Sequence, residues 1–91
     1  MSAVVQFRPP ANAVDTYPDT ARYKGGFAIR SESSSSVYKI SFDAAPGAMY
    51  WTCSCPGNIR HGDCKHLRAI GLKGRRYGAQ REEAKKFGFA P

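Results

Sequence analysis

The chain has 91 residues and a formal net charge of +7, from 14 lysines and arginines against 7 aspartates and glutamates. This length suits one small domain with a limited core, in which a metal ion or another staple often supplies stability. No apolar run is long enough to span a bilayer, and residues 1–10 lack the charged and apolar regions of a signal peptide. We therefore expect an intracellular, reducing location, in the cytoplasm or with the nucleoid or nucleus, and no membrane partner.

Residues 1–20 contain three prolines, Pro9, Pro10 and Pro18, and few candidates for a core. Proline cannot donate a hydrogen bond to a sheet, so this composition predicts an N-terminal arm that is mostly extended or flexible. Residues 4–7 are apolar enough for a short edge strand, which Pro9 and Pro10 would end.

Three stretches after this arm predict β-strands, over residues 27–31, 37–42 and 49–55. In the second stretch the side chains alternate, so that the apolar residues from Tyr38 to Phe42 fall on one face. The polar run before it and the Pro-Gly pair after it suit turns. We expect the three strands to form an antiparallel meander whose last strand runs into the first cysteines.

Two helices are expected after the strands. Residues 56–58, Pro-Gly-Asn, predict a turn that ends the last strand. Asp63 suits the N-cap of a main helix over residues 64–72. A short C-terminal helix over residues 79–87 follows a basic turn.

All three cysteines and both histidines lie between residues 53 and 66, where four of them form the pattern C-x-C-x8-C-x-H. Side chains two residues apart in a strand share a face, so Cys53 and Cys55 can aim both sulfurs at one point. Cys64 and His66 would lie in or near the first turn of the main helix, whose free N–H groups favour thiolate over thiol. Three thiolates and one imidazole suit a single structural Zn²⁺ with tetrahedral coordination.

Other readings of these residues are weaker. His61 is an alternative fourth ligand, although its place between Arg60 and Gly62 also suits a solvated loop histidine. A disulfide framework is disfavoured because the number of cysteines is odd and no secretion signal is evident. Ordinary buried or surface thiols would not explain why every cysteine and histidine falls in one short segment.

The pattern resembles the SWIM-type zinc finger, C-x-C-x(n)-C-x-H, including the apolar residue Leu67 after Cys-Lys-His. The resemblance covers roughly residues 27–72, with its specific part at residues 51–70. It favours His66 over His61 as the fourth ligand. SWIM modules occur in transposases, helicase-like ATPases, recombination factors and ubiquitin ligases, so the resemblance implies a zinc module that contacts DNA or protein.

These observations together predict a small zinc-stapled α+β domain. A three-stranded antiparallel meander would precede one main helix and a short C-terminal helix. The predicted organisation is an N-terminal arm over residues 1–24, a SWIM-like zinc-binding domain over residues 25–76 and a C-terminal helix or tail over residues 77–91.

Positive charge is concentrated beside the predicted zinc site, where Asp63 is the only acid between residues 60 and 76. Lysine and arginine contact phosphates, so we expect this segment to bind a nucleic-acid backbone, of DNA rather than RNA, in an accessory or regulatory factor. A solvated helix face is the simpler reading of the same charges. The candidate nucleic-acid contacts are Arg60, Lys65, Arg68, Lys73, Arg75 and Arg76.

The alternative function is a protein-interaction adaptor with a purely structural zinc. Tyr50, Trp51 and Tyr77 would then be aromatic anchors for the partner, unless they pack the core. We expect no enzyme and no small-molecule substrate, because the sequence has no Gly-rich phosphate loop or nucleophile elbow. A zinc ion with four protein ligands also leaves no position for a catalytic water.

Overall fold

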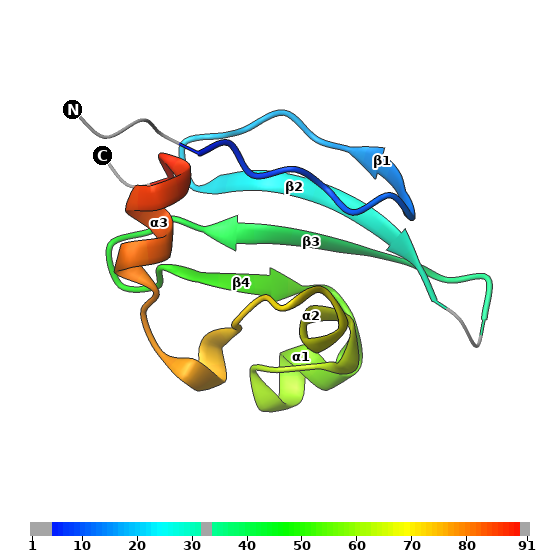
Figure 1. Cartoon of the computed structure of the whole chain (residues 1–91). Coiled ribbons are helices and arrows are strands. Elements are labelled where there is room, and N and C mark those ends of the chain that lie inside the picture. Colours follow the sequence, from blue (N-terminus) through cyan, green and yellow to red (C-terminus); the bar gives the residue numbers. More distant parts are fainter. Residues whose placement is uncertain (1–4, 32–33, 90–91) are drawn as a thin grey trace.

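Four antiparallel strands form one sheet in the order β1-β2-β3-β4, and short helices follow them in the chain (Figure 1). The computed structural model describes residues 5–31 and 34–89. The predicted α+β class is confirmed. The elements are β1 (Ala13–Thr16), β2 (Tyr23–Arg30), β3 (Val37–Asp43), β4 (Tyr50–Cys53), α1 (Pro56–His61), α2 (Lys65–Ile70), the 3-10 helix η1 (Arg75–Tyr77) and α3 (Arg81–Phe87).

The sheet has one strand more than the three predicted, because β1 lies within the expected N-terminal arm. It pairs with β2, with Ala13 opposite Ile29 and Thr16 opposite Phe27, and the register shifts at a bulge between these pairs. Three of its four residues are exposed, so its sequence carries no alternation of buried and polar residues. The alternative strand over residues 4–7 begins outside the described residues, and Val5 instead donates its N–H to the carbonyl of Lys86 at 2.9 Å.

The core lies between the sheet and the segments that follow it. Phe27, Ile40, Phe42, Trp51 and Leu67 are completely buried. The register places Ile40 of β3 between two partners, Phe27 of β2 and the first cysteine of β4. The apolar face predicted for residues 38–42 therefore forms the sheet side of the core. This face adjoins the cysteine site, because Ile40 pairs with Cys53.

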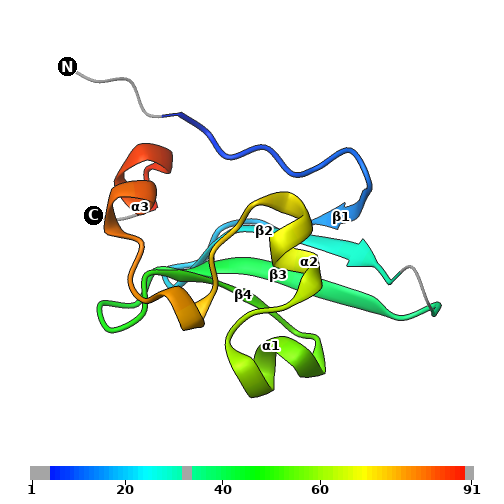
Figure 2. The ribbon, with the colours of Figure 1, turned by 60° about the horizontal axis from the view of Figure 1, so that its bottom comes forward.

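An aromatic cluster at the other end of β4 joins the two ends of the chain. The ring of Phe7 lies 4.6 Å from that of Trp51, and the ring of Phe89 lies 5.1 Å from that of Phe42. Figure 2 shows α3 at this end of the sheet, with α1 and α2 beside β4 at the opposite end. Trp51 is thus a core residue rather than an aromatic anchor for a partner, whereas Tyr77 is 50 % exposed.

The helical region differs most from the expectation. Residues 56–58 begin a helix, α1, instead of a turn, because Pro56 at the first helical position needs no N–H partner and Cys55 caps the helix. The main helix, expected over residues 64–72, is the shorter α2. It ends at Gly71, which adopts a left-handed φ of 83° that glycine takes without strain. The short C-terminal helix is present as α3, and it buries Ala84 against the core.

No helix within residues 5–31 and 34–89 has the length and apolar character that a membrane crossing needs.

Candidate metal centre

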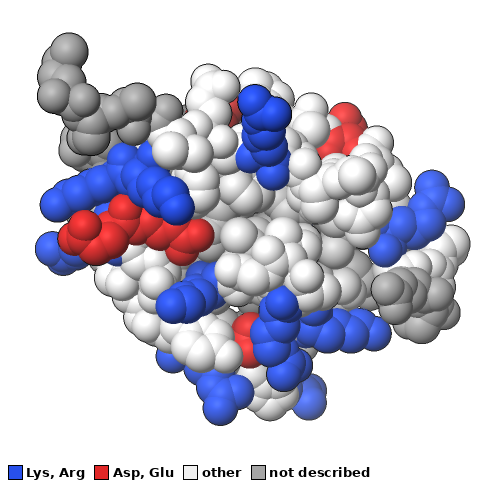
Figure 3. All heavy atoms as spheres, viewed as in Figure 1, with Lys and Arg blue, Asp and Glu red and all other residues white. Residues whose placement is uncertain are grey.

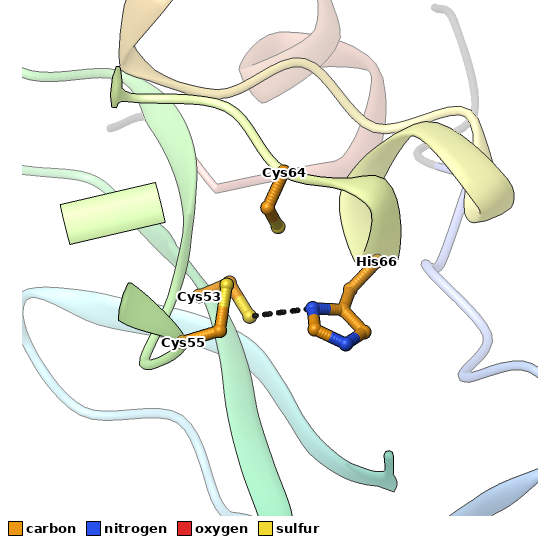
Figure 4. A group of neighbouring side chains, drawn as sticks. All are labelled: Cys53, Cys55, Cys64 and His66. Atoms are coloured by element: carbon orange, nitrogen blue, oxygen red, sulfur yellow. Dashed lines mark hydrogen bonds between the residues drawn. The ribbon is translucent and has the colours of Figure 1, made fainter. Parts of the chain in front are cut away.

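Four side chains that offer soft or borderline donor atoms converge at the C-terminal end of β4. The sulfurs of Cys53, Cys55 and Cys64 and a ring nitrogen of His66 all lie within 4.8 Å of one another (Figure 4). In a tetrahedral zinc site, metal–ligand bonds of about 2.0–2.3 Å place the donor atoms roughly 3.5–3.8 Å apart. Small rotations of the side chains would therefore bring all four donors onto one metal ion.

The end of β4 and the start of α1 hold the first two cysteines. Cys53 is the last residue of the strand, and Cys55 is the N-cap of α1, where its Sγ accepts a hydrogen bond from the N–H of Asn58 at 3.4 Å. Both cysteines are 4 % exposed. The i and i+2 spacing thus delivers two sulfurs to one point, as predicted, although the strand ends before the second of them.

The start of α2 holds the other two donors. Cys64 is the N-cap residue of α2, and His66 lies in the first turn. The Nδ1 atom of His66 lies 3.9 Å from the Sγ of Cys53, and its ring lies 4.9 Å from that of Tyr38 (Figure 4). His61, the alternative fourth ligand, is exposed in the last turn of α1 and does not belong to the cluster.

The protein environment disfavours the thiolate form of Cys53 and of Cys64. Burial is the largest cause that raises the pKa of Cys53 and of Cys64, and neighbouring thiols raise both pKa values further. Backbone hydrogen bonds near the start of α2 lower the pKa of Cys64, as the helix-start argument expected, but burial outweighs them. All three cysteines are free of disulfides. A bound cation would supply the positive charge that three buried thiolates require.

Asn58 is a supporting residue that the sequence reasoning placed in a turn and did not connect with the metal. It is 7 % exposed, and its Oδ1 accepts a hydrogen bond from the N–H of Cys53 at 3.2 Å. Its own N–H donates to Cys55, as described above, and its carbonyl accepts from the N–H of Gly62 at 2.8 Å. One residue therefore orients the two cysteines on either side of the bend between β4 and α1.

Hydrogen bonds join the end of α1 and the loop that follows it to the segment around η1. The carbonyl of Gly62 accepts the N–H of Arg76 at 3.0 Å, and Nη2 of Arg75 donates to the carbonyl of Ile59 at 3.3 Å. Asp63 was expected to cap the main helix. Instead, its Oδ2 accepts the hydroxyl of Tyr77 at 3.3 Å and lies 3.6 Å from Nε of Arg68.

These contacts hold α1, α2 and η1 close together, and these elements carry five of the six predicted basic residues. Figure 3 shows lysine and arginine side chains over the region of α1, α2 and η1, with little acidic surface among them. Asp63 is only 6 % exposed, so its carboxylate contributes little to that surface. All six candidate residues are exposed, on α1 (Arg60), on α2 (Lys65 and Arg68), in the following loop (Lys73) and on η1 (Arg75 and Arg76).

No model of a protein family, no curated protein and no solved structure matches this chain. The features of this chain that bear on its function are therefore the cysteine–histidine cluster and the charges beside it.

Proposed function

We propose that this chain is a small zinc protein that binds nucleic acid, DNA in preference to RNA, through the basic surface around α1, α2 and η1. The observation that carries the proposal is the position of that surface directly beside the Cys₃His cluster. The zinc would be structural and would fix the elements that present the cations. The SWIM resemblance adds support, because modules of that type are zinc modules that contact DNA or protein.

The chemistry of the four donors supports zinc in particular. Three thiolates with one imidazole, all from protein, suit a closed structural zinc site. Hard cations such as Mg²⁺ and Ca²⁺ prefer oxygen ligands, which the cluster does not offer. Cysteines that stay reduced and available to a metal ion also fit a reducing, intracellular location.

The charge distribution supports a polyanionic partner. The chain carries twice as many basic as acidic residues, and the carboxylate of Asp63, which lies near the cluster, is buried against Arg68 and Tyr77. A surface of this kind attracts phosphates without reading base sequence. An accessory or regulatory factor, which contributes affinity rather than chemistry, fits such a surface.

The test is the affinity of the zinc-loaded protein for labelled DNA, measured by fluorescence anisotropy over a range of salt concentrations. We expect the logarithm of affinity to fall linearly with the logarithm of salt concentration, by about 0.9 for each phosphate contacted in a duplex. Replacing Arg60 and Arg76 by glutamine should lower that slope by about one for each phosphate that the variant no longer binds. The matched control replaces Arg81 and Lys85 by glutamine as well, and it should leave the slope unchanged. These two residues are exposed cations of α3 beside Glu82 and Glu83.

Negligible affinity at low salt, or an affinity that does not change with salt, would overturn the proposal. A partner that is captured in high salt and after nuclease treatment would then favour the adaptor function. Equal losses of affinity in the double variant and in the α3 control would show that total charge, rather than this surface, determines binding.

A further inference from the structure

A pocket of about 390 Å³ opens at the candidate metal centre, and Cys55, Cys64 and His66 form part of its lining. A metal ion on these donors would fill the end of the pocket that they line, and the other lining residues would surround the space beside it. Tyr38 and His66 line the pocket with their rings, and Pro56 lines it from the start of α1. The pocket also reaches Lys65 and Arg68, two exposed cations of α2.

The chemistry of the lining matches two parts of a nucleotide. The half-buried ring of Tyr38, held 4.9 Å from the ring of His66, offers an aromatic surface on which a flat base can stack. The ammonium of Lys65 and the guanidinium of Arg68 offer contacts for the phosphate that accompanies the base. Asp63 also lines the pocket, and its Oδ2 accepts a hydrogen bond from the Tyr77 hydroxyl and lies 3.6 Å from Nε of Arg68, which balances part of its charge.

We infer that this pocket receives an unpaired base and that the protein binds single-stranded nucleic acid more tightly than duplex, an inference that rests on the function proposed above. In a duplex the bases are stacked and paired inside the helix, so a duplex can touch only the cations outside the pocket. A single strand can place a base on Tyr38 while its phosphates contact the same cations. The pocket would thus allow a surface that contacts phosphates to distinguish a single strand from a duplex.

The experiment compares the zinc-loaded protein on one labelled single strand of mixed sequence and on the same strand annealed to its complement. We expect the single strand to bind roughly tenfold more tightly, since stacking of one base on an aromatic side chain accounts for a difference of this order. Tyr38→Leu should remove that preference and leave duplex affinity unchanged, whereas Tyr38→Phe should keep it. The matched control is Tyr23→Leu, which removes a 39 % exposed tyrosine at a different pocket, beside Lys39 and Thr52.

Three results separate this inference from the proposed function. Binding to neither DNA would overturn both. Equal or tighter binding to duplex by the unmodified protein would overturn the pocket inference alone, without any variant. The pocket inference alone would also be overturned if Tyr38→Leu retains the preference for the single strand while the absorption spectrum of its Co²⁺ form shows an intact metal centre.

Discussion

The side-chain Oδ1 of Asn58 accepts a hydrogen bond from the backbone N–H of Cys53 at 3.2 Å, across the bend between β4 and α1. Asn58 also donates its own N–H to the sulfur of Cys55. It therefore holds both members of the C-x-C pair without offering a ligand itself. Residues that orient metal ligands in this way strongly influence metal affinity.

We expect Asn58→Ala to lower metal affinity by about 10- to 100-fold, the usual effect of losing a residue that supports the ligands. The Cys53 N–H would lose its partner, and the bend that aligns the two sulfurs would loosen. Competition with a chelator measures the affinity. Ile59→Ala is the matched control, because the neighbouring Ile59 side chain is 70 % exposed. Equal affinities of the two variants would contradict the role assigned to Asn58.

The two histidines should differ sharply in their effect on metal binding. His66→Ala removes a donor from the cluster, so its cost should exceed the roughly 100-fold upper range for supporting residues. His61→Ala should leave metal affinity unchanged, because His61 is exposed on α1 and lies outside the cluster. Titration of each variant with Co²⁺, followed by absorbance, measures both affinities. A reversed order would assign the fourth ligand to His61.

Close packing of two loops makes Gly74 sensitive to any side chain. A Cβ atom at Gly74 would collide with the carbonyl oxygen of Gly62 and would lie 3.1 Å from Leu67. Because a backbone atom cannot move as a flexible side chain can, Gly74→Ala should destabilise the fold by about 1–3 kcal/mol. Gly47→Ala is the control, since its Cβ would meet no atom within 4 Å. Denaturant unfolding compares them, and similar midpoints would disprove the close approach.

An ion pair on the sheet should make stability depend on acid pH. Arg22 donates to both carboxylate oxygens of Asp43, each at 3.0 Å, and the N–H of Ala45 donates to one of them at 3.1 Å. Burial alone raises the pKa of Asp43, but these hydrogen bonds outweigh it and hold the pKa below its ordinary value. The carboxylate thus stabilises the fold fully above the unfolded-state pKa of about 3.9, and this contribution is lost as the pH falls through the folded-state value.

Asp43→Asn should therefore lower the melting temperature at neutral pH and reduce the loss of stability on acidification. Thermal melts from about pH 7 to the acid side of pH 3.9 test this, with the metal centre common to both proteins. Asp15→Asn, which changes an exposed carboxylate of β1, serves as the control. Parallel curves for the unmodified protein and Asp43→Asn would contradict the ion pair's contribution.

The fold class and the clustering of four donors followed from local patterns in the sequence. The alternation around Ile40 identified the core strand, and two C-x-C or C-x-H pairs at element ends identified the cluster. Three features did not follow. The strand β1 buries little side-chain surface. The helix α1 begins after Cys55, which is both its N-cap and a candidate metal ligand. The hydrogen bond between Asn58 and Cys53 joins two groups that sequence spacing alone does not pair. The first depends on pairing with β2, and the other two depend on local side-chain hydrogen bonds, none of which single-residue preferences encode.

We propose that one metal ion joins the end of β4 to the start of α2. Structural zinc in small domains contributes on the order of 10–16 kcal/mol of apparent binding free energy, comparable with the total stability of about 5–15 kcal/mol of a typical domain. The most direct test is native mass spectrometry of the folded protein, combined with elemental analysis. We predict one zinc ion per chain and unfolding when a chelator removes it. A folded chain that carries no metal would contradict the claim.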